Sequence, residues 1–122
     1  MKVLFVGGTG TISSACSELA VEKGIDLYHL NRGHSHRKIS GVTQIIGDIR
    51  NRVAAQNALK DHTFDVVVNW INFTPEHILN DLEIFTGKTG QYIFISSASA
   101  YQKPPQQLPI TEETPLDNPF WQ

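Results

Sequence analysis

The stretch VLFVGGTGTISSACSELA, residues 3–20, decides the fold of this 122-residue chain. It opens with an apolar, β-rich run, breaks into three glycines and then resumes with apolar residues at helical spacing. The apolar run predicts a strand over residues 2–6. The spacing i, i+3, i+4, i+7 and i+8 that follows predicts an amphipathic helix whose buried face consists of Ile12, Ala15, Cys16, Leu19 and Ala20.

The rest of the chain alternates strand-like and helix-like segments. Further strands are predicted over residues 26–30, 42–46, 64–69 and 91–96, and further helices over residues 50–60 and 75–86. Thr74 and Pro75 have the residue types of an N-cap and first helical position. The last helix has an apolar stripe of Ile78, Leu79, Leu82 and Phe85. Because parallel strands need such crossovers, we expect an α/β fold: a Rossmann-type doubly wound parallel sheet, in strand order 3-2-1-4-5, within three αβα layers.

A change of composition marks the end of this alternating pattern. Five of the six prolines lie in the last 19 residues, which have neither helical nor strand periodicity. We therefore expect a dinucleotide-binding domain over residues 1–101 and a proline-rich loop or tail over residues 102–122.

The overall composition excludes several function classes. Hydrophobic residues make up 40% of the chain, charged residues 18%, and the formal net charge is −2. This balance indicates neither a nucleic-acid partner nor a membrane surface. The first residues lack the pattern of a signal peptide, so we expect a cytoplasmic protein. Cys16, the one cysteine, is interpreted as a small buried thiol.

The position of the glycines, between a predicted strand and a predicted helix, indicates a binding function. Gly8, Gly10 and Ser13 form G-x-G-x-x-S between a predicted strand and a predicted helix. Such a turn lets the backbone approach a pyrophosphate, whose charge meets the free N–H groups of the helix N-terminus. The alternative is a glycine-rich connection that binds nothing. We favour a dinucleotide site and assign its turn to Gly7, Gly8, Thr9, Gly10, Thr11 and Ile12.

The end of the second predicted strand indicates which dinucleotide is bound. NAD-binding folds usually carry an acid there, whereas this chain has Asn31 and Arg32 and no acid between Asp26 and Asp48. Arg37 lies in the same basic loop, beside Lys38, His34 and His36. A basic loop suits a 2′-phosphate, so we predict NADP, with NAD as the alternative cofactor. The competing interpretation is a solvated basic loop.

Two other motifs do not support a site. His34 and His36 lack a third ligand at a useful spacing, so we predict no metal site. The segment GKTG, residues 87–90, resembles the end of a P-loop, but it follows a helix and precedes a strand.

Four separated motifs, VGGTGTIS, GDIRN, DVVVN and YIFISSASAYQKP, occur in an order that resembles a known family. The chain is similar to the extended short-chain dehydrogenase/reductase superfamily, in its NAD-dependent epimerase/dehydratase or nucleotide-sugar epimerase branch. The resemblance covers essentially all 122 residues. Val6 replaces the usual threonine and Ser13 the third glycine, which indicates an atypical subgroup.

The resemblance implies roles for individual residues. Asp48 would accept a hydrogen bond from the adenine amino group, and Ile49 would lie beside the ring. Asp48 could also cap the helix that begins near Arg50. The nicotinamide-side ribose would contact Asn69, Trp70 and Ile71. In S-S-x-x-x-Y the catalytic serine corresponds to Ser97, although serines at a strand end also serve as turn formers.

The resemblance further implies hydride transfer between a nicotinamide and a carbon of a nucleotide sugar, with the tyrosine of Y-x-x-x-K as acid and base. These 122 residues contain no Y-x-x-x-K. We therefore expect the cofactor-binding N-terminal half of an epimerase, dehydratase or reductase, inactive by itself. A non-catalytic NADP-sensing regulator is the alternative. Family dimers commonly pair through the helix at 75–86, so a homodimer is one arrangement that the resemblance allows.

Overall fold

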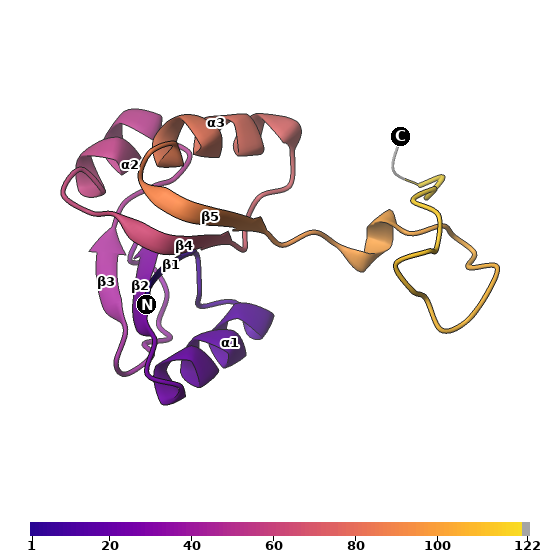
Figure 1. Cartoon of the computed structure of the whole chain (residues 1–122), viewed down its shortest axis with the longest axis horizontal. Helices are drawn as coiled ribbons and strands as arrows, with labels where there is room; N and C mark the ends of the chain where they lie inside the picture. The colour runs from indigo at the N-terminus through magenta and orange to yellow at the C-terminus, as the bar shows by residue number, and fades with distance from the viewer. Residues whose placement is uncertain (121–122) are drawn as a thin grey trace.

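Five strands form a single parallel sheet in the computed structural model, which describes residues 1–120 (Figure 1). Their order across the sheet is β3-β2-β1-β4-β5, as the sequence predicts. The strands are β1 (Lys2–Val6), β2 (Asp26–Asn31), β3 (Thr43–Ile46), β4 (Phe64–Asn69) and β5 (Thr89–Phe94). The chain therefore has the Rossmann-type doubly wound topology.

Helices cover both faces of this sheet. Figure 1 shows α1 (Thr11–Glu22) on one face, with α2 (Arg52–Ala58) and α3 (Pro75–Phe85) together on the other. A short 3-10 turn, η1 (Ala98–Ala100), follows β5. This arrangement confirms the predicted three layers.

The core consists of two clusters, one on each face of the sheet. Toward α2 and α3 the cluster includes Leu4, Leu59 and Ile84, and toward α1 it includes Phe5 and Leu27. Successive residues of β1 point to opposite faces, so this central strand contributes to both clusters. This explains its continuous apolar sequence.

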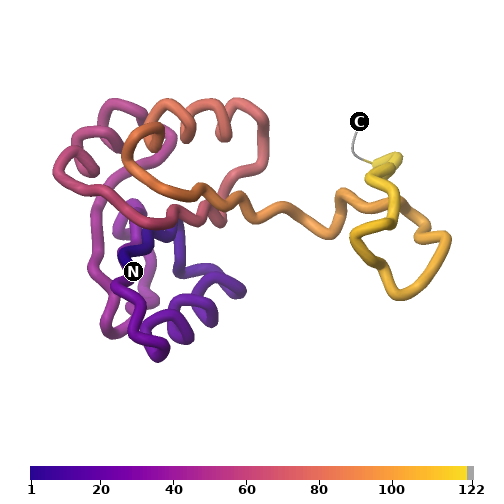
Figure 2. The backbone as a smooth tube through the Cα atoms, in the orientation of Figure 1, coloured from indigo at the N-terminus to yellow at the C-terminus, as the bar shows by residue number. Residues whose placement is uncertain are grey.

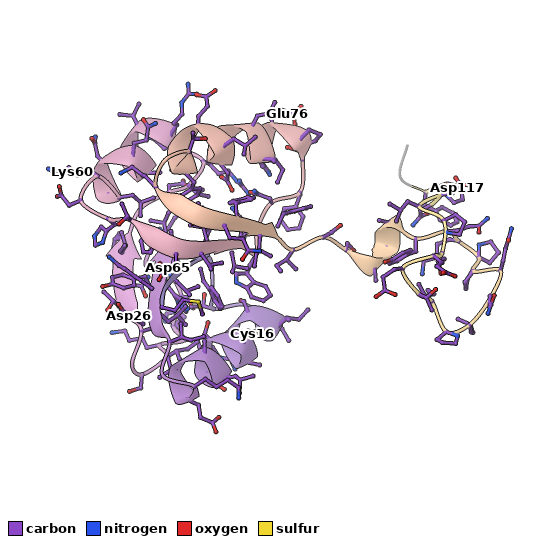
Figure 3. All side chains as sticks on the ribbon, viewed as in Figure 1. Cys16, Asp26, Lys60, Asp65, Glu76 and Asp117 are labelled. Atoms are coloured by element: carbon purple, nitrogen blue, oxygen red, sulfur yellow. The ribbon has the colours of Figure 1, made fainter. Side chains whose placement is uncertain are left out.

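The face that α1 buries differs from the predicted one. Ile12 is 71% exposed and Leu19 50% exposed, while the face against the sheet is formed by Ser13, Ser14, Ser17 and Ala20. The predicted buried face is therefore wrong, because the face of α1 that packs on the sheet is rotated about the helix axis from the predicted apolar stripe. Small side chains let the helix approach the sheet closely. The Ser14 and Ser17 hydroxyls donate to backbone carbonyl oxygens, and the Ser13 hydroxyl accepts from the Gly10 N–H. Cys16 is half-buried, with its sulfur on the side of α1 that faces the sheet (Figure 3).

The buried face of α3 also differs from the expected stripe. Thr74 is the N-cap and Pro75 the first residue, as predicted, and Phe85 is buried. Leu79 and Leu82, however, are 61% and 48% exposed, and the interior positions are taken by Asp81 and Ile84. A hydrophobicity pattern could not identify Asp81 as interior, because that position depends on hydrogen-bond partners elsewhere in the fold.

Beyond β5 the chain leaves the sheet and runs away from it (Figure 2). Residues 102–120 form turns and bends without a helix or strand. The last two positions of the predicted tail, 121 and 122, lie outside the described residues. Within the described part of the chain, the helices are too short or too polar to cross a membrane.

Candidate functional site

The carboxyl ends of the strands meet at one edge of the sheet, and backbone hydrogen bonds hold the following segments together there. The Gly7 N–H donates to the Leu30 carbonyl oxygen at 3.0 Å, and the Trp70 N–H donates to that of Val6 at 3.1 Å. The Ile95 N–H donates to the Asn69 carbonyl oxygen at 3.1 Å. Ligands bind at this edge in open α/β sheets, where the strand order reverses beside β1.

The glycine turn lies at this point, and its Gly8 has no room for a side chain. Gly8 has a φ of 96°, and a Cβ atom on it would lie 2.5 Å from the His29 ring. Gly10 is the N-cap of α1 and has no side chain that could accept a hydrogen bond from the first helical turn. The amides of that turn and the positive end of the helix dipole are therefore available to an anion.

Three cavities adjoin the turn. The large cavity, of about 640 Å³, extends from Gly10–Ser13 to residues 94–100. The second cavity, of about 500 Å³, lies beside the ends of β2 and β3, and the third, of about 400 Å³, lies under the loop that follows β2. Thr9 lines both the second and the third cavity, while Phe73 lines both the large and the second. The cavities thus follow one another around the turn.

Most of the predicted site residues line these cavities. The large cavity has Gly10, Thr11, Ile12, Trp70 and Ser97; the second has Thr9, Asn31, Arg32, Asp48, Ile49 and Ile71; the third has Thr9, Asn31 and Arg37. Gly7, Gly8 and Asn69 are not among the lining residues. The remaining predicted residues therefore line one or more of these cavities, and the site itself stays a prediction.

Among those three, Asn69 supports the site from below. Its side chain is fully buried, donates to Asp81 Oδ2 at 2.5 Å and accepts from the Ile71 N–H at 2.8 Å. Ile49 also belongs largely to the core, since it is only 3% exposed. Neither side chain is free to reorient toward a ligand.

Asp48 is half-buried at the second cavity, where its Oδ1 accepts from the Arg50 N–H at 2.9 Å. The alternative that Asp48 caps the following helix is wrong. Asn51 is the N-cap of α2, and its side chain accepts from the Ala54 N–H at 3.1 Å. Asp48 is therefore not the N-cap of α2.

The basic residues after β2 are divided between two cavities. Arg32 lines the second cavity and Arg37 the third, and both are exposed. The Arg37 guanidinium donates to the Ser14 hydroxyl at 2.5 Å, which holds it against α1. The described residues that line the third cavity include no acid.

Ser97 follows β5 on the wall of the large cavity and is exposed. Its hydroxyl accepts from the Ser99 N–H at 3.1 Å and lies 2.8 Å from the Ser99 hydroxyl, so Ser97 also forms the N-cap of η1. Both interpretations of this serine, as turn former and as site residue, are compatible with that geometry.

Sequence reasoning missed His29. Its ring is 1% exposed, its Nε2 lies 2.8 Å from the Ser17 hydroxyl, and the same hydroxyl lies 3.2 Å from the Gly8 carbonyl oxygen. Burial lowers the pKa of His29 to about 4, so the imidazole is neutral at physiological pH. The signal available in the sequence was a histidine in an otherwise buried strand.

A second missed group lies beneath the loop that follows β4. Asp81 is fully buried, and its Oδ2 accepts from Asn72 Nδ2 at 2.7 Å and from the Tyr92 hydroxyl at 2.6 Å. The pKa of Tyr92 is raised, chiefly because the hydroxyl is buried. Its hydrogen bond to Asp81 and the negative charge of Asp81 raise this pKa further. Tyr92 therefore stays protonated and acts as a donor to the carboxylate. An aspartate on the same helical face as Ile84 and Phe85 could have indicated this group.

The profile of the NAD dependent epimerase/dehydratase family matches residues 3–122. The chain belongs to this family. The matched range begins in β1 and includes the glycine turn, the three cavities and the segment after β5.

Two relatives give the scale of the similarity. The chain is 30% identical to a UDP-glucose 4-epimerase of Lactobacillus helveticus over 98% of its own length, and it spans 43% of that relative. It is also 30% identical to a UDP-glucose 4-epimerase of Klebsiella pneumoniae, covering 92% of this chain and 99% of that sequence. The chain thus corresponds to less than half of the first relative.

Solved structures share the fold. The UDP-glucose 4-epimerase from Bifidobacterium longum, in complex with NAD+ and UDP, superposes with a TM-score of 0.79 at 22% identity, over 98% of this chain and 44% of that one. The UDP-Glc/GlcNAc 4-epimerase from Campylobacter jejuni gives a TM-score of 0.78 at 18% identity, over 95% and 43% of the two chains.

Proposed function

We propose that this chain is the dinucleotide-binding portion of a nucleotide-sugar epimerase, dehydratase or reductase. One observation carries the proposal: a glycine turn in which Gly8 has no room for a Cβ leads into α1, whose N-cap Gly10 has no side chain, between consecutive cavities. Backbone amides at such a turn suit a pyrophosphate, and the cavities on either side suit its two nucleoside ends. The B. longum epimerase, whose complex contains NAD+ and UDP, supports this interpretation through its fold.

We further propose NADP as the preferred dinucleotide. An acid that would repel a 2′-phosphate is missing from the described lining of the third cavity, while Arg37 contributes a guanidinium there. Arg32 and Asn31 lie next to it in the second cavity. Guanidinium groups bind phosphates through two parallel hydrogen bonds, so these arginines fit a phosphate ester on the adenosine ribose.

A binding experiment tests this preference. NADPH and NADH are titrated into the chain, with dissociation constants measured by calorimetry. We expect NADPH to bind about tenfold more tightly, the equivalent of one charge-assisted hydrogen bond. Arg37→Ala should remove most of that difference, and Lys23→Ala, at the far end of α1, should not. Equal affinities of the unchanged chain for both dinucleotides would rule out the NADP assignment.

Ser97 is proposed as the residue that holds the reacting oxygen of the sugar. It lies on the wall of the large cavity, opposite the first turn of α1. The bound nicotinamide would supply hydride acceptance and donation. The Tyr of Y-x-x-x-K does not occur in these residues, so the chain alone should not interconvert sugar nucleotides. Epimerisation of UDP-glucose by this polypeptide would contradict that expectation.

We also propose a homodimer that pairs through α3. Leu79 and Leu82 are exposed, and positions i and i+3 share one face of a helix. Covering them in a dimer would remove apolar surface from water.

A further inference from the structure

Arg50 connects two segments of the site and has no role in the function proposed above. It follows Asp48 and Ile49, and its side chain is exposed at the second cavity. One guanidinium nitrogen, Nη1, donates to Asn72 Oδ1 at 2.8 Å, and the other, Nη2, donates to the Ile71 carbonyl oxygen. The planar Arg50 guanidinium thus donates hydrogen bonds to two consecutive residues, Ile71 and Asn72. Both belong to the segment 70–73, which we call the β4–α3 loop.

The contact continues into the protein interior. Asn72 is 4% exposed and uses its Nδ2 to donate to the fully buried Asp81 at 2.7 Å. A buried carboxylate is costly unless hydrogen bonds and a positive charge compensate it. Asn72 therefore lies between a guanidinium at the surface and a carboxylate in the core, with its amide oriented by both.

The β4–α3 loop forms the wall between two cavities. Trp70 and Asn72 line the large cavity, Ile71 lines the second, and Phe73 lines both. A shift of this loop would change the shape of both cavities together. Arg50 belongs to the segment after β3, which also lines the second cavity, and its hydrogen bonds connect that segment to the loop.

We propose that Arg50, acting through Asn72 and Asp81, is a positioning residue that fixes the β4–α3 loop for dinucleotide binding. The inference rests on the proposed function, because the ligand that benefits from the fixed loop is the dinucleotide. The alternative role for Arg50 is that of a simple positive charge that attracts the phosphates. Lysine would preserve this charge but could not reproduce the fork of two hydrogen bonds.

The first experiment needs no ligand. Hydrogen exchange of the β4–α3 loop is followed by mass spectrometry in the unchanged 122-residue chain and in Arg50→Met, Arg50→Lys and Asn72→Ala. We expect roughly fivefold faster exchange confined to this loop in all three variants. Arg52→Met is the matched control, since Arg52 is a nearby exposed arginine that pairs with Glu83 instead. Wild-type protection in Arg50→Met or Arg50→Lys, or faster exchange throughout the chain, would overturn the positioning role.

The second experiment measures NADPH dissociation constants for Arg50→Met, Asn72→Ala and the double variant. Each single change should weaken binding about tenfold, and the double variant should be no weaker than either, because both changes break the same connection. Additive losses, or unchanged affinity in Arg50→Met, would refute the inference. If the unchanged chain bound no dinucleotide, the proposed function would fail, while the exchange result would still decide whether Arg50 fixes the loop.

Discussion

At the scale of single residues, Gly8 offers the sharpest test of the turn. Gly8→Ala places a methyl group 2.5 Å from the His29 ring at a φ of 96°. We expect a loss of about 3 kcal/mol in the free energy of unfolding, from backbone strain and overpacking together, and loss of dinucleotide binding. Urea unfolding and NADPH titration measure the two effects.

Gly24→Ala is the matched control for Gly8→Ala. Gly24 also has a positive φ, of 74°, but a Cβ there would meet no atom within 4 Å. It should lose only about 1 kcal/mol, from strain alone, and should bind NADPH normally. Similar losses in the two variants would show that the contact with His29 does not matter.

His29 predicts a loss of stability in acid. Its pKa is about 4 in the folded chain, against 6.5 for an ordinary histidine, because burial disfavours the charged ring. As the pH falls from 6.5 to 4, the unfolded chain gains a proton that the folded chain does not. The free energy of unfolding should therefore decrease by about 1.4 kcal/mol per pH unit in this window from this group.

Urea midpoints measured between pH 7.5 and pH 4 test the His29 prediction by comparison of two variants. His29→Gln should lower the stability at neutral pH and flatten its dependence on pH. His36→Gln, at an exposed position, should retain the full slope. A slope in His29→Gln as steep as in the unchanged chain would exclude His29 as the cause.

At the scale of secondary-structure elements, α3 carries the test of the homodimer. Leu79→Glu and Leu82→Glu place charges on its exposed face and should shift the chain toward monomer in sedimentation velocity. Leu19→Glu makes the same change on α1, where the leucine is 50% exposed, and should leave the association unchanged. A monomeric wild-type chain at all concentrations would disprove pairing through α3.

The helices also show which features of the fold could be predicted from sequence patterns. The existence and order of the strands and α-helices could be predicted, but not the short η1 turn, because alternation of apolar runs and helical segments reflects the parallel topology itself. The buried faces of α1 and α3 could not. Ser17 and Asp81 are interior because of acceptors and donors on other elements, and the pattern of hydrophobic residues does not contain that information.

The same reasoning applies to the candidate site. Its expected position at the end of β1 follows from the glycines, because a glycine-rich turn between a strand and a helix can be recognised in a sequence. The hydrogen-bonded residues around it, such as His29 and Asn72, are separated in the sequence by many residues from Ser17 and Arg50, to which they bond. Such pairings become evident only when the strands are aligned.

At the scale of the whole molecule, the proposed domain boundary can be tested by truncation. Among the described residues, the side chain of Asn118 donates to the Ser99 carbonyl oxygen, and the other hydrogen bonds of the tail are within the tail itself. A chain of residues 1–101 should therefore unfold within a few degrees of the full chain in thermal circular dichroism. A chain that ends at residue 88 loses β5, the neighbour of β4, and should not fold. A large decrease in the midpoint for residues 1–101 would place the boundary later in the chain.

The serine-lined face of α1 has a mechanical consequence. Aliphatic side chains would hold a helix on a sheet without fixing its rotation or its sliding along the strands, because hydrophobic attraction has no direction. Ser17, by contrast, lies within hydrogen-bond distance of the Gly8 carbonyl oxygen and of the His29 ring. Because hydrogen bonds are directional, these contacts fix the rotation of α1 and its angle to the sheet as well as its distance from it. The amides of its first turn therefore have a fixed orientation at the proposed pyrophosphate site.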